Sequence, residues 1–244
     1  ENRLEFLKSK YGVQVSTDAE EGIKDSEIAI LSVKPQNVKS LASSIIHPPP
    51  GLLLSIVAGL PVADIKRYFR TNKVIRSMPN TPAMVLEGMT VWLSTPETPA
   101  HLIDKATTLL NSFGEQMQVY DEQYIDMATA VSGSGPAYVF LTMEAMIDAA
   151  VHLGFPRDMA TKLVIATIKG SAIYAQQSED HTARLRNSVT SPGGTTASAL
   201  YELDRGGFRT VVADAIWAAY RRALELGGND PNVGPGRSKF PSGK

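Results

Sequence analysis

The chain has 244 residues, of which 43% are hydrophobic and none is cysteine, and its formal net charge is −1. This length allows one large or two modest domains, each with its own core. The near-neutral charge argues against nucleic acid as a partner, and the absence of cysteine excludes disulfides, thiolate nucleophiles and cysteine-ligated zinc. A chain without cysteine is consistent with a cytoplasmic location.

The first half of the chain alternates helical and strand patterns. Helices are expected at residues 2–10, from 17 or 18, at 35–45, from 61 and at 99–113, and strands at 13–15, 27–33, 52–57, 73–77, 88–93 and 116–120. The segment 27–33 has the near-continuous apolar character of a strand buried in a parallel sheet. This β–α–β rhythm predicts a doubly wound α/β domain over residues 1–120.

From about Asp121 onward the patterns are helical only. Helices are expected at residues 121–130, 136–154, 156–176, 182–189, 195–205 and 208–226, separated by breaks at Gly154-Phe155-Pro156 and Gly206-Gly207. The sequence therefore predicts a second, all-α domain over residues 121–227. Residues 228–244 are rich in Gly, Pro, Asn and Ser, which predicts a disordered tail.

Four of the expected strands have unusual segments at their carboxyl ends, which are expected to share one rim of the sheet. The first three segments are Ser32-Val33-Lys34-Pro35-Gln36, Val57-Ala58-Gly59 and Arg76-Ser77-Met78-Pro79-Asn80-Thr81-Pro82, and the fourth end, after Val119, leads into the helical half. Ligands of open parallel sheets bind outside the carboxyl ends of the strands. Small residues and prolines would let a flat ligand lie against the backbone, which favours a nucleotide, although each loop alone is also explained as a structural turn.

The helical half contains the turn Ser191-Pro192-Gly193-Gly194-Thr195-Thr196. Its glycines permit backbone angles closed to other residues, and its threonines fall where a helix is expected to begin. The unpaired N–H groups and the positive dipole end of such a helix attract a small anion, a carboxylate as readily as a phosphate. The alternative is an ordinary turn between helices with a threonine N-cap.

Nothing in the sequence indicates a nucleophile or a metal site. The four histidines, His47, His101, His152 and His181, are scattered and form no metal-binding pair. The run 132–135, Ser-Gly-Ser-Gly, is not a nucleophile elbow, because it leads into a helix of the helical half; we expect a glycine-loosened helix start that approaches another backbone. The acidic pairs 121–122 and 179–180 lie at expected helix starts, where capping explains them. Such a chain suits hydride transfer, in which a cofactor supplies the chemistry.

Four motifs then coincide in one order along the chain. They are Val33-Lys34-Pro35-Gln36, Met78-Pro79-Asn80-Thr81-Pro82, Ser132-Gly133-Ser134-Gly135-Pro136-Ala137-Tyr138 and Val189-Thr190-Ser191-Pro192-Gly193-Gly194-Thr195-Thr196. With them the chain closely resembles the pyrroline-5-carboxylate reductase family, from about Arg3 to Leu226. The resemblance implies a Rossmann-like domain followed by a helical dimerisation domain. It also implies reduction of 1-pyrroline-5-carboxylate to L-proline with NADPH or NADH, the last step of proline biosynthesis.

The resemblance assigns roles to individual positions. It implies cofactor contacts for Val33, Lys34, Pro35, Ala58 and Gly59, and places Asn80 and Thr81 near the nicotinamide. It implies a site for the substrate carboxylate at Ser191, Gly193, Gly194 and Thr195. Thr196 would hydrogen-bond the ring nitrogen of the imine, and Glu179 would contact the same nitrogen, so both are expected to assist hydride attack on C5 of the imine.

The resemblance also implies a homodimer, and in some members a ring of dimers. Members begin with a strand, a glycine-rich turn, a helix and a second strand; here the chain opens at the helix expected next, so the α/β domain as given is expected to lack its first β–α–β unit. Two alternatives follow: a truncated, non-catalytic dimerising chain of the same family, and a related dehydrogenase acting on 3-hydroxy acids or another imine. That last group uses a lysine in its first long helix, and residues 139–151 contain none.

Overall fold

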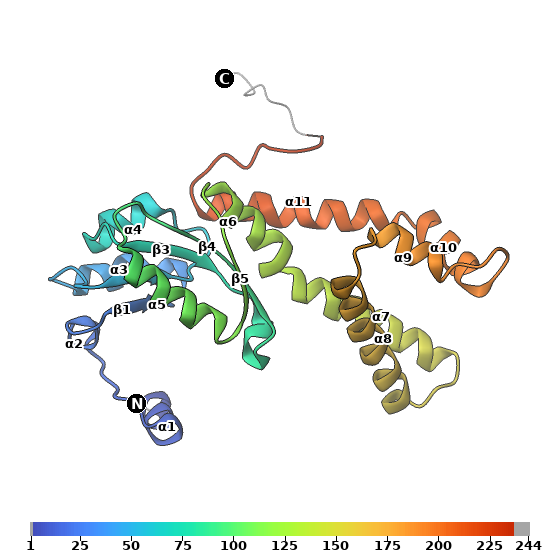
Figure 1. Ribbon diagram of the computed structural model, residues 1–244, viewed down its shortest axis with the longest axis horizontal. Helices are drawn as coiled ribbons and strands as arrows, with labels where there is room; N and C mark the ends of the chain where they lie inside the picture. The colour runs from blue at the N-terminus through green and yellow to red at the C-terminus, as the bar shows by residue number, and fades with distance from the viewer. Residues whose placement is uncertain (1, 237–244) are drawn as a thin grey trace. The chain divides into compact units, whose positions relative to one another are not determined.

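The computed structural model describes residues 2–236 and divides the chain into two compact units, residues 1–134 with 217–244 and residues 135–216 (Figure 1). The first unit holds the strands β1 (Ile28–Leu31), β2 (Leu52–Ser55), β3 (Val74–Met78), β4 (Gly88–Ser94) and β5 (Gly114–Gln118). Its helices are α1 (Asn2–Tyr11), α2 (Ala19–Ile23), α3 (Val38–Ser44), α4 (Val62–Phe69), α5 (Ala100–Asn111) and α6 (Gln123–Ala128). Short 3₁₀ helices, η1 (Pro35–Asn37) and η2 (Thr81–Val85), follow β1 and β3.

The five strands form one sheet in the order β1-β2-β3-β4-β5. Strands β1, β2 and β3 are parallel, β4 is antiparallel to β3, and β5 is parallel to β4. The reversal at β4 has a simple cause: a parallel partner requires a long crossover connection, and only η2 and a few further residues join β3 to β4. The predicted α/β fold is confirmed, but β4 and β5 both run in the direction opposite to β1, β2 and β3.

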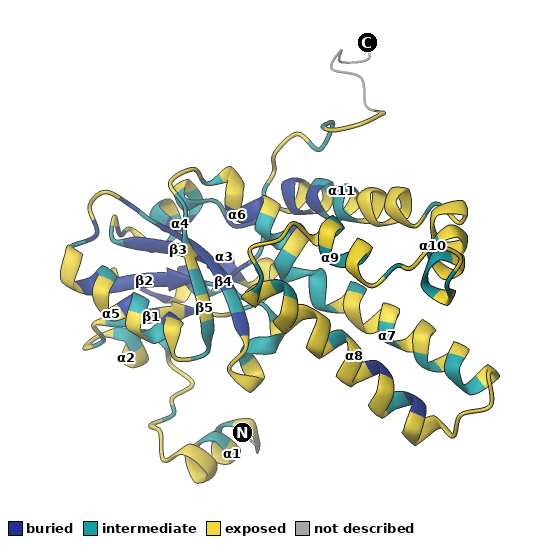
Figure 2. Cartoon of the chain, turned by 45° about the vertical axis from the view of Figure 1, so that its right-hand side comes forward, coloured by how far each residue is buried: buried dark blue, intermediate teal, exposed yellow. Residues whose placement is uncertain are grey.

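Successive residues of the central strands pack on opposite faces of the sheet, as the period of two in a strand requires. Leu53 and Val74 belong to a core cluster with Ile65 and Phe69 of α4. Their neighbours Leu54 and Ile75 belong to a second cluster, with Leu102, Ala106 and Leu110 of α5. The sheet is thus covered on both faces, and its central strands are buried in Figure 2.

The predicted strand at residues 13–15 is not formed, because no strand in the described part of the chain pairs with it. Strand β1 consequently lies at one edge of the described sheet, and its residue Ile30 is 52% exposed. The other predicted strands are confirmed with small shifts in their bounds. Asp18 caps α2, its carboxylate accepting from the N–H groups of Glu20 and Glu21, as the sequence predicted.

The second unit consists of α7 (Gly135–His152), α8 (Arg157–Gln177), α9 (Thr182–Ser188), α10 (Thr195–Arg205) and the first part of α11 (Phe208–Leu226). Among the residues described here, only Ala160 and Val164 of this unit are buried. Figure 2 shows α7, α9 and α10 as exposed or half-buried throughout. No helix between residues 2 and 236 is long and apolar enough to cross a membrane.

The boundary between the units lies at residue 134 rather than at 120, where the sequence placed it. Helix α6 stays with the sheet because Ile125 is buried beside Val91 and Leu93 of β4. Residues 129–133 continue α6 as a π-helix, and α7 begins at Gly135, the last residue of the Ser-Gly-Ser-Gly run, so the expected helix start is confirmed. A Cβ on Gly133 would lie 2.9 Å from the side chain of Met78, so Gly133 closely approaches a side chain rather than a backbone.

The segment that follows α11 makes specific contacts in its described part. Arg221 Nε donates to the carbonyl of Val233 at 3.0 Å, and Gly234 lies directly against the ring of Trp217. Residues 229–236 are therefore held against α11, which differs from the disordered tail predicted for 228–244. The rest of that predicted tail, residues 237–244, lies outside the described residues.

Candidate active site

The positions predicted to contact a cofactor gather at one edge of the sheet. Residues 33–35 follow β1, residues 58–59 follow β2 and residues 80–81 follow β3. Because these three strands are parallel neighbours, their carboxyl ends meet at the same edge. The sheet order thus confirms a common rim for these three loops. The fourth predicted end, after Val119, follows β5, which runs opposite to β1, β2 and β3, so that end lies at the other edge of the sheet.

The hydrogen bonds and burial of these loop residues show which of their polar groups could contact a ligand. Asn80 is the N-cap residue of η2, and its Oδ1 accepts from the N–H of Met89 at 2.9 Å, which fixes the loop to β4. Among the described residues its amide nitrogen has no hydrogen-bond partner, so it can donate to a ligand. Within the described chain the ammonium of Lys34 has no hydrogen-bond or ion-pair partner, so it is available to an anion. Val33 is partly buried against the core, and Pro35 is the first residue of η1.

Gly59 combines a left-handed backbone with a close approach. Its φ is +66°, and a Cβ would lie 2.6 Å from Cβ of Leu226 at the end of α11. The glycine that the sequence assigned to the cofactor therefore also accommodates the last turn of α11. Beside it lies a cavity of about 410 Å³, whose lining includes Pro35, Gln36, Gly59 and Leu60.

The predicted anion site is built as a tight turn ahead of α10. Gly193 has a φ of +68°, Gly194 is the N-cap residue, and the N–H of Gly194 donates to the carbonyl of Ser191 at 3.0 Å. A Cβ on Gly194 would lie 2.5 Å from Oγ of Ser191 and 3.2 Å from its carbonyl oxygen, so the Ser191 side chain would have to rotate away. Helix α10 then begins at Thr195, and the N–H groups of its first turn have no partner within the helix.

Glu179 lies in the loop between α8 and α9, in the same unit as this turn. Its carboxylate is exposed and has no hydrogen-bond or ion-pair partner among the described residues. Neither acidic residue of the pair 179–180 caps α9 as predicted: Nδ1 of His181 accepts from the N–H of Ala183 at 3.1 Å, and Asp180 pairs with Arg184. Helix capping therefore does not account for the presence of Glu179. Its carboxylate is available to a ligand.

The sequence analysis missed a buried ion cluster on β3. The Arg76 side chain is 2% exposed; its Nη1 lies 2.7 Å from Oε1 of Glu122, and its Nη2 lies 2.5 Å from Oδ1 of Asp126. Two signals pointed to it: a cation inside an otherwise apolar strand, and two carboxylates four residues apart on a predicted helix. Burial raises the pKa of the Asp126 carboxyl above its ordinary value, although Arg76 opposes this shift.

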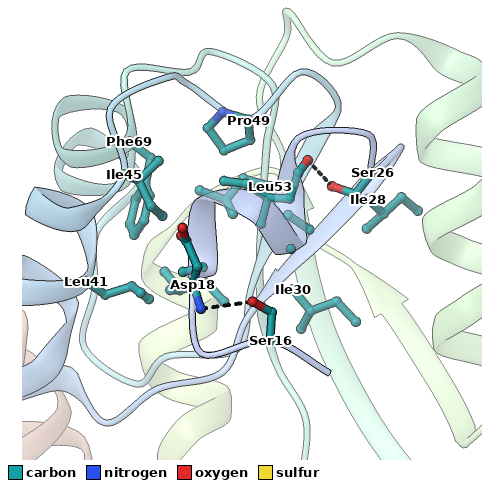
Figure 3. Close-up of a pocket in the computed structure, with 15 residues that line it drawn as sticks. Ser16, Asp18, Ser26, Ile28, Ile30, Leu41, Ile45, Pro49, Leu53 and Phe69 are labelled. Carbon is teal, nitrogen blue, oxygen red and sulfur yellow. Dashed lines mark hydrogen bonds between the residues drawn. The ribbon is translucent and has the colours of Figure 1, made fainter. Parts of the chain in front are cut away.

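A second cavity, of about 370 Å³, lies between α2, α3 and the outer edge of β1 (Figure 3). Its lining is mostly apolar, and Asp18, the ionisable residue in it, already caps α2. This cavity offers no group for chemistry. Across the described residues no group of three or more His, Cys, Asp or Glu side chains could hold a metal ion.

A largely parallel sheet with a loop rim at its carboxyl edge, followed by an all-helical unit, is the architecture of a two-domain dinucleotide-binding oxidoreductase. A family model for pyrroline-5-carboxylate reductase dimerisation matches residues 122–226, and a model for NADP oxidoreductase, coenzyme F420-dependent, matches residues 1–59. The pyrroline-5-carboxylate reductase of Synechocystis sp. is 40% identical over 229 residues, covering 92% of this chain and 84% of the relative.

Solved structures agree with these sequence matches. The pyrroline carboxylate reductase of Plasmodium falciparum, determined with NADP bound, superposes with a TM-score of 0.82 at 34% identity, covering 87% of this chain and 81% of that one. The enzyme of Streptococcus pyogenes gives a TM-score of 0.85 at 26% identity, covering 92% of this chain and 86% of that one. The chain belongs to the pyrroline-5-carboxylate reductase family.

Proposed function

We propose that this chain reduces 1-pyrroline-5-carboxylate to L-proline, with NADPH as the reductant and NADH as the second candidate. The observation that carries the proposal is the turn at residues 191–196, a ready site for a carboxylate at the start of α10 in a chain of this family. The fold alone would not identify a substrate. A helix N-terminus that suits a small anion favours substrates that carry a carboxylate or a phosphate.

The rim at the carboxyl ends of β1, β2 and β3 is the proposed cofactor site. Support comes from the unpartnered ammonium of Lys34, which suits a phosphate, and from the free amide nitrogen of Asn80, which suits a nicotinamide carboxamide. Val33, Pro35, Ala58, Gly59 and Thr81 would complete the binding surface. When bound, the dihydronicotinamide supplies a hydride.

In the second unit the proposed roles concern the substrate. Ser191, Gly193, Gly194 and Thr195 would hold its carboxylate, because backbone N–H groups at a helix start bind anions without a compensating cation. The ring nitrogen of the imine must be protonated or strongly hydrogen-bonded, so that negative charge does not build on it. The Thr196 hydroxyl would orient that nitrogen, and the unpaired carboxylate of Glu179 would stabilise its positive charge.

The second unit is the proposed surface of homodimerisation. Helix α7 is strongly apolar but contributes no buried residue, and its Phe140 and Leu141 are 60% and 67% exposed. A monomer rarely leaves so much apolar surface in water, and a second copy of the same unit would cover it. The dimerisation model that matches residues 122–226 supports this proposal.

Two experiments test the function. The chain is mixed with 1-pyrroline-5-carboxylate and NADPH, and the nicotinamide absorbance is followed; turnover supports the reductase, and its absence supports the non-catalytic dimerising alternative. Light scattering after size exclusion then measures the mass of wild type, Phe140→Asp and the control Ile46→Asp. Only Phe140→Asp should fall to the mass of one chain, and a wild-type mass of several dimers would indicate a ring. The cytoplasmic location stays a prediction.

A further inference from the structure

We propose that the buried cluster of Arg76, Glu122 and Asp126 positions the two cofactor loops that follow β2 and β3, and so acts as a positioning device for hydride transfer. This inference rests on the proposed function. All the residues that carry it belong to the first unit. Arg76, Glu122 and Asp126 themselves are not assigned to the cofactor or to the substrate.

The cluster joins three elements through one carboxylate oxygen. Oε1 of Glu122 accepts from Nη1 of Arg76 on β3 and also from the backbone N–H of Val62, both at 2.7 Å. Val62 is the first residue of α4, and its N–H is one of the groups that a helix start leaves unpaired. Glu122, which immediately precedes α6, therefore fixes the start of α4 to β3.

Each end of this connection lies next to a proposed cofactor loop. Val62 closes the loop that contains Ala58 and Gly59, so a shift of the α4 start would move that loop. Arg76 lies four residues before Asn80, on the strand that carries the nicotinamide loop. The strands before the two loops are paired, with Ser55 beside Arg76, and the Glu122 carboxylate adds a further link between the loops themselves. The second carboxylate, Asp126, holds the other arm of the same guanidinium.

The cluster is poorly explained as a device for stability. Removing the charged groups of Arg76 and Asp126 from water is expensive, and well-packed apolar residues in their place are often as stable or more so. Glu122 adds less to this cost, because its side chain is 36% exposed. In addition, Nε of Arg76 is buried and has no hydrogen-bond partner among the residues that the structure describes. The planar guanidinium, with both of its arms hydrogen-bonded, instead fixes the relative positions of the elements it joins. Apolar side chains do not impose such directional constraints.

The test separates position from stability. In the double variant Arg76→Met/Asp126→Leu the buried pair becomes apolar; in Glu122→Gln the bond from Val62 can persist but the charge is lost. Glu97→Gln is the control, because it changes a surface pair with Lys66 in the same unit. Each protein is measured for its melting temperature, its affinity for NADPH by fluorescence, its kcat and KM, and the isotope effect with NADPH deuterated at C4.

The double variant should stay folded while kcat/KM falls about 10- to 100-fold, the usual penalty for misplaced reacting groups. In Glu122→Gln, kcat/KM should fall about 3- to 10-fold. In both variants the affinity for NADPH should weaken and the isotope effect should rise. The control Glu97→Gln should match wild type in all of these measurements. Values within twofold of wild type for a folded double variant would overturn the proposal; if that variant does not fold, Glu122→Gln decides alone. Wild-type turnover is measured first, so failure of the proposed function is seen separately, and the NADPH affinities then test the positioning role.

Discussion

Gly59 offers a test of close packing that is separate from backbone strain. In Gly59→Ala the new methyl group would meet Cβ of Leu226 at 2.6 Å and its carbonyl carbon at 2.9 Å, while φ is +66°. In the control Gly228→Ala the φ is nearly the same, +72°, and no atom lies within 4 Å. Both variants bear the cost of a left-handed alanine, about 1–2 kcal/mol, partly offset by a stiffer unfolded chain.

The difference between the two variants measures the contact with α11. Backbone atoms at the end of α11 would have to move in Gly59→Ala, which adds about 1–3 kcal/mol on the scale of overpacked cores. The free energy of unfolding should therefore fall by about that much more in Gly59→Ala than in Gly228→Ala. Urea unfolding followed by tryptophan fluorescence reports this, because Trp92 and Trp217 both belong to the first unit. Protein concentration is held constant, since association shifts apparent stability.

Equal losses in the two variants, within about 0.5 kcal/mol, would refute the reasoning. Such a result would mean that the last turn of α11 moves freely away from the sheet. The same proteins titrated with NADPH give a second measurement, because Gly59 is also a proposed cofactor contact.

Three further predictions concern single side chains. Thr196→Ala should lower kcat/KM about 10- to 100-fold, the loss of one positioned hydrogen bond, and Thr196→Ser should restore much of it; wild-type kinetics in the alanine variant would remove Thr196 from the mechanism. Because burial raises the pKa of Asp126, the folded chain binds a proton there more readily than the unfolded chain, and this contribution is lost as the pH rises through the raised pKa. Wild type should therefore gain stability relative to Asp126→Asn as the pH falls from 7 toward about 4, and a constant difference in urea titrations would contradict this assignment. Gly234→Ala should release residues 229–236 from α11, because its Cβ would lie 2.5 Å from the Trp217 ring; unchanged amide hydrogen exchange in that segment would argue otherwise.

The elements that the sequence predicted best are those whose signals are local. Helices α10 and α11 begin and end where the glycines and the apolar period place them, and the strands that form buried ladders were found within a few residues. The strand at 13–15 failed because a strand also depends on a partner, and no local pattern reports whether one exists. The reversal of β4 depends on the length of η2, which is visible in sequence only once both strands are fixed.

Site residues divide in the same way. The glycine turn ahead of α10 has a local signature, and the three loops follow from strand ends, so both could be predicted. The pairing of Arg76 with Glu122 joins positions 46 residues apart and appears only when α6 is packed on the sheet. The contact of Gly59 with Leu226 likewise joins distant parts of the chain. A glycine in sequence indicates that space is short, but not which neighbour takes it.

Because the second unit buries few residues of its own, the activity of the proposed enzyme should depend on the protein concentration. Among the residues described here only Ala160 and Val164 of this unit are buried, so its helices would gain much of their stability from the proposed partner copy. At low levels the concentration of the dimer would then rise with the square of the free chain concentration. The stability of the first unit should not depend on the chain concentration in this way, because this unit has its own core. A sparsely expressed chain would therefore keep its first unit folded while losing the turn proposed to hold the substrate. Specific activity would then decline on dilution before any loss of the sheet could be detected.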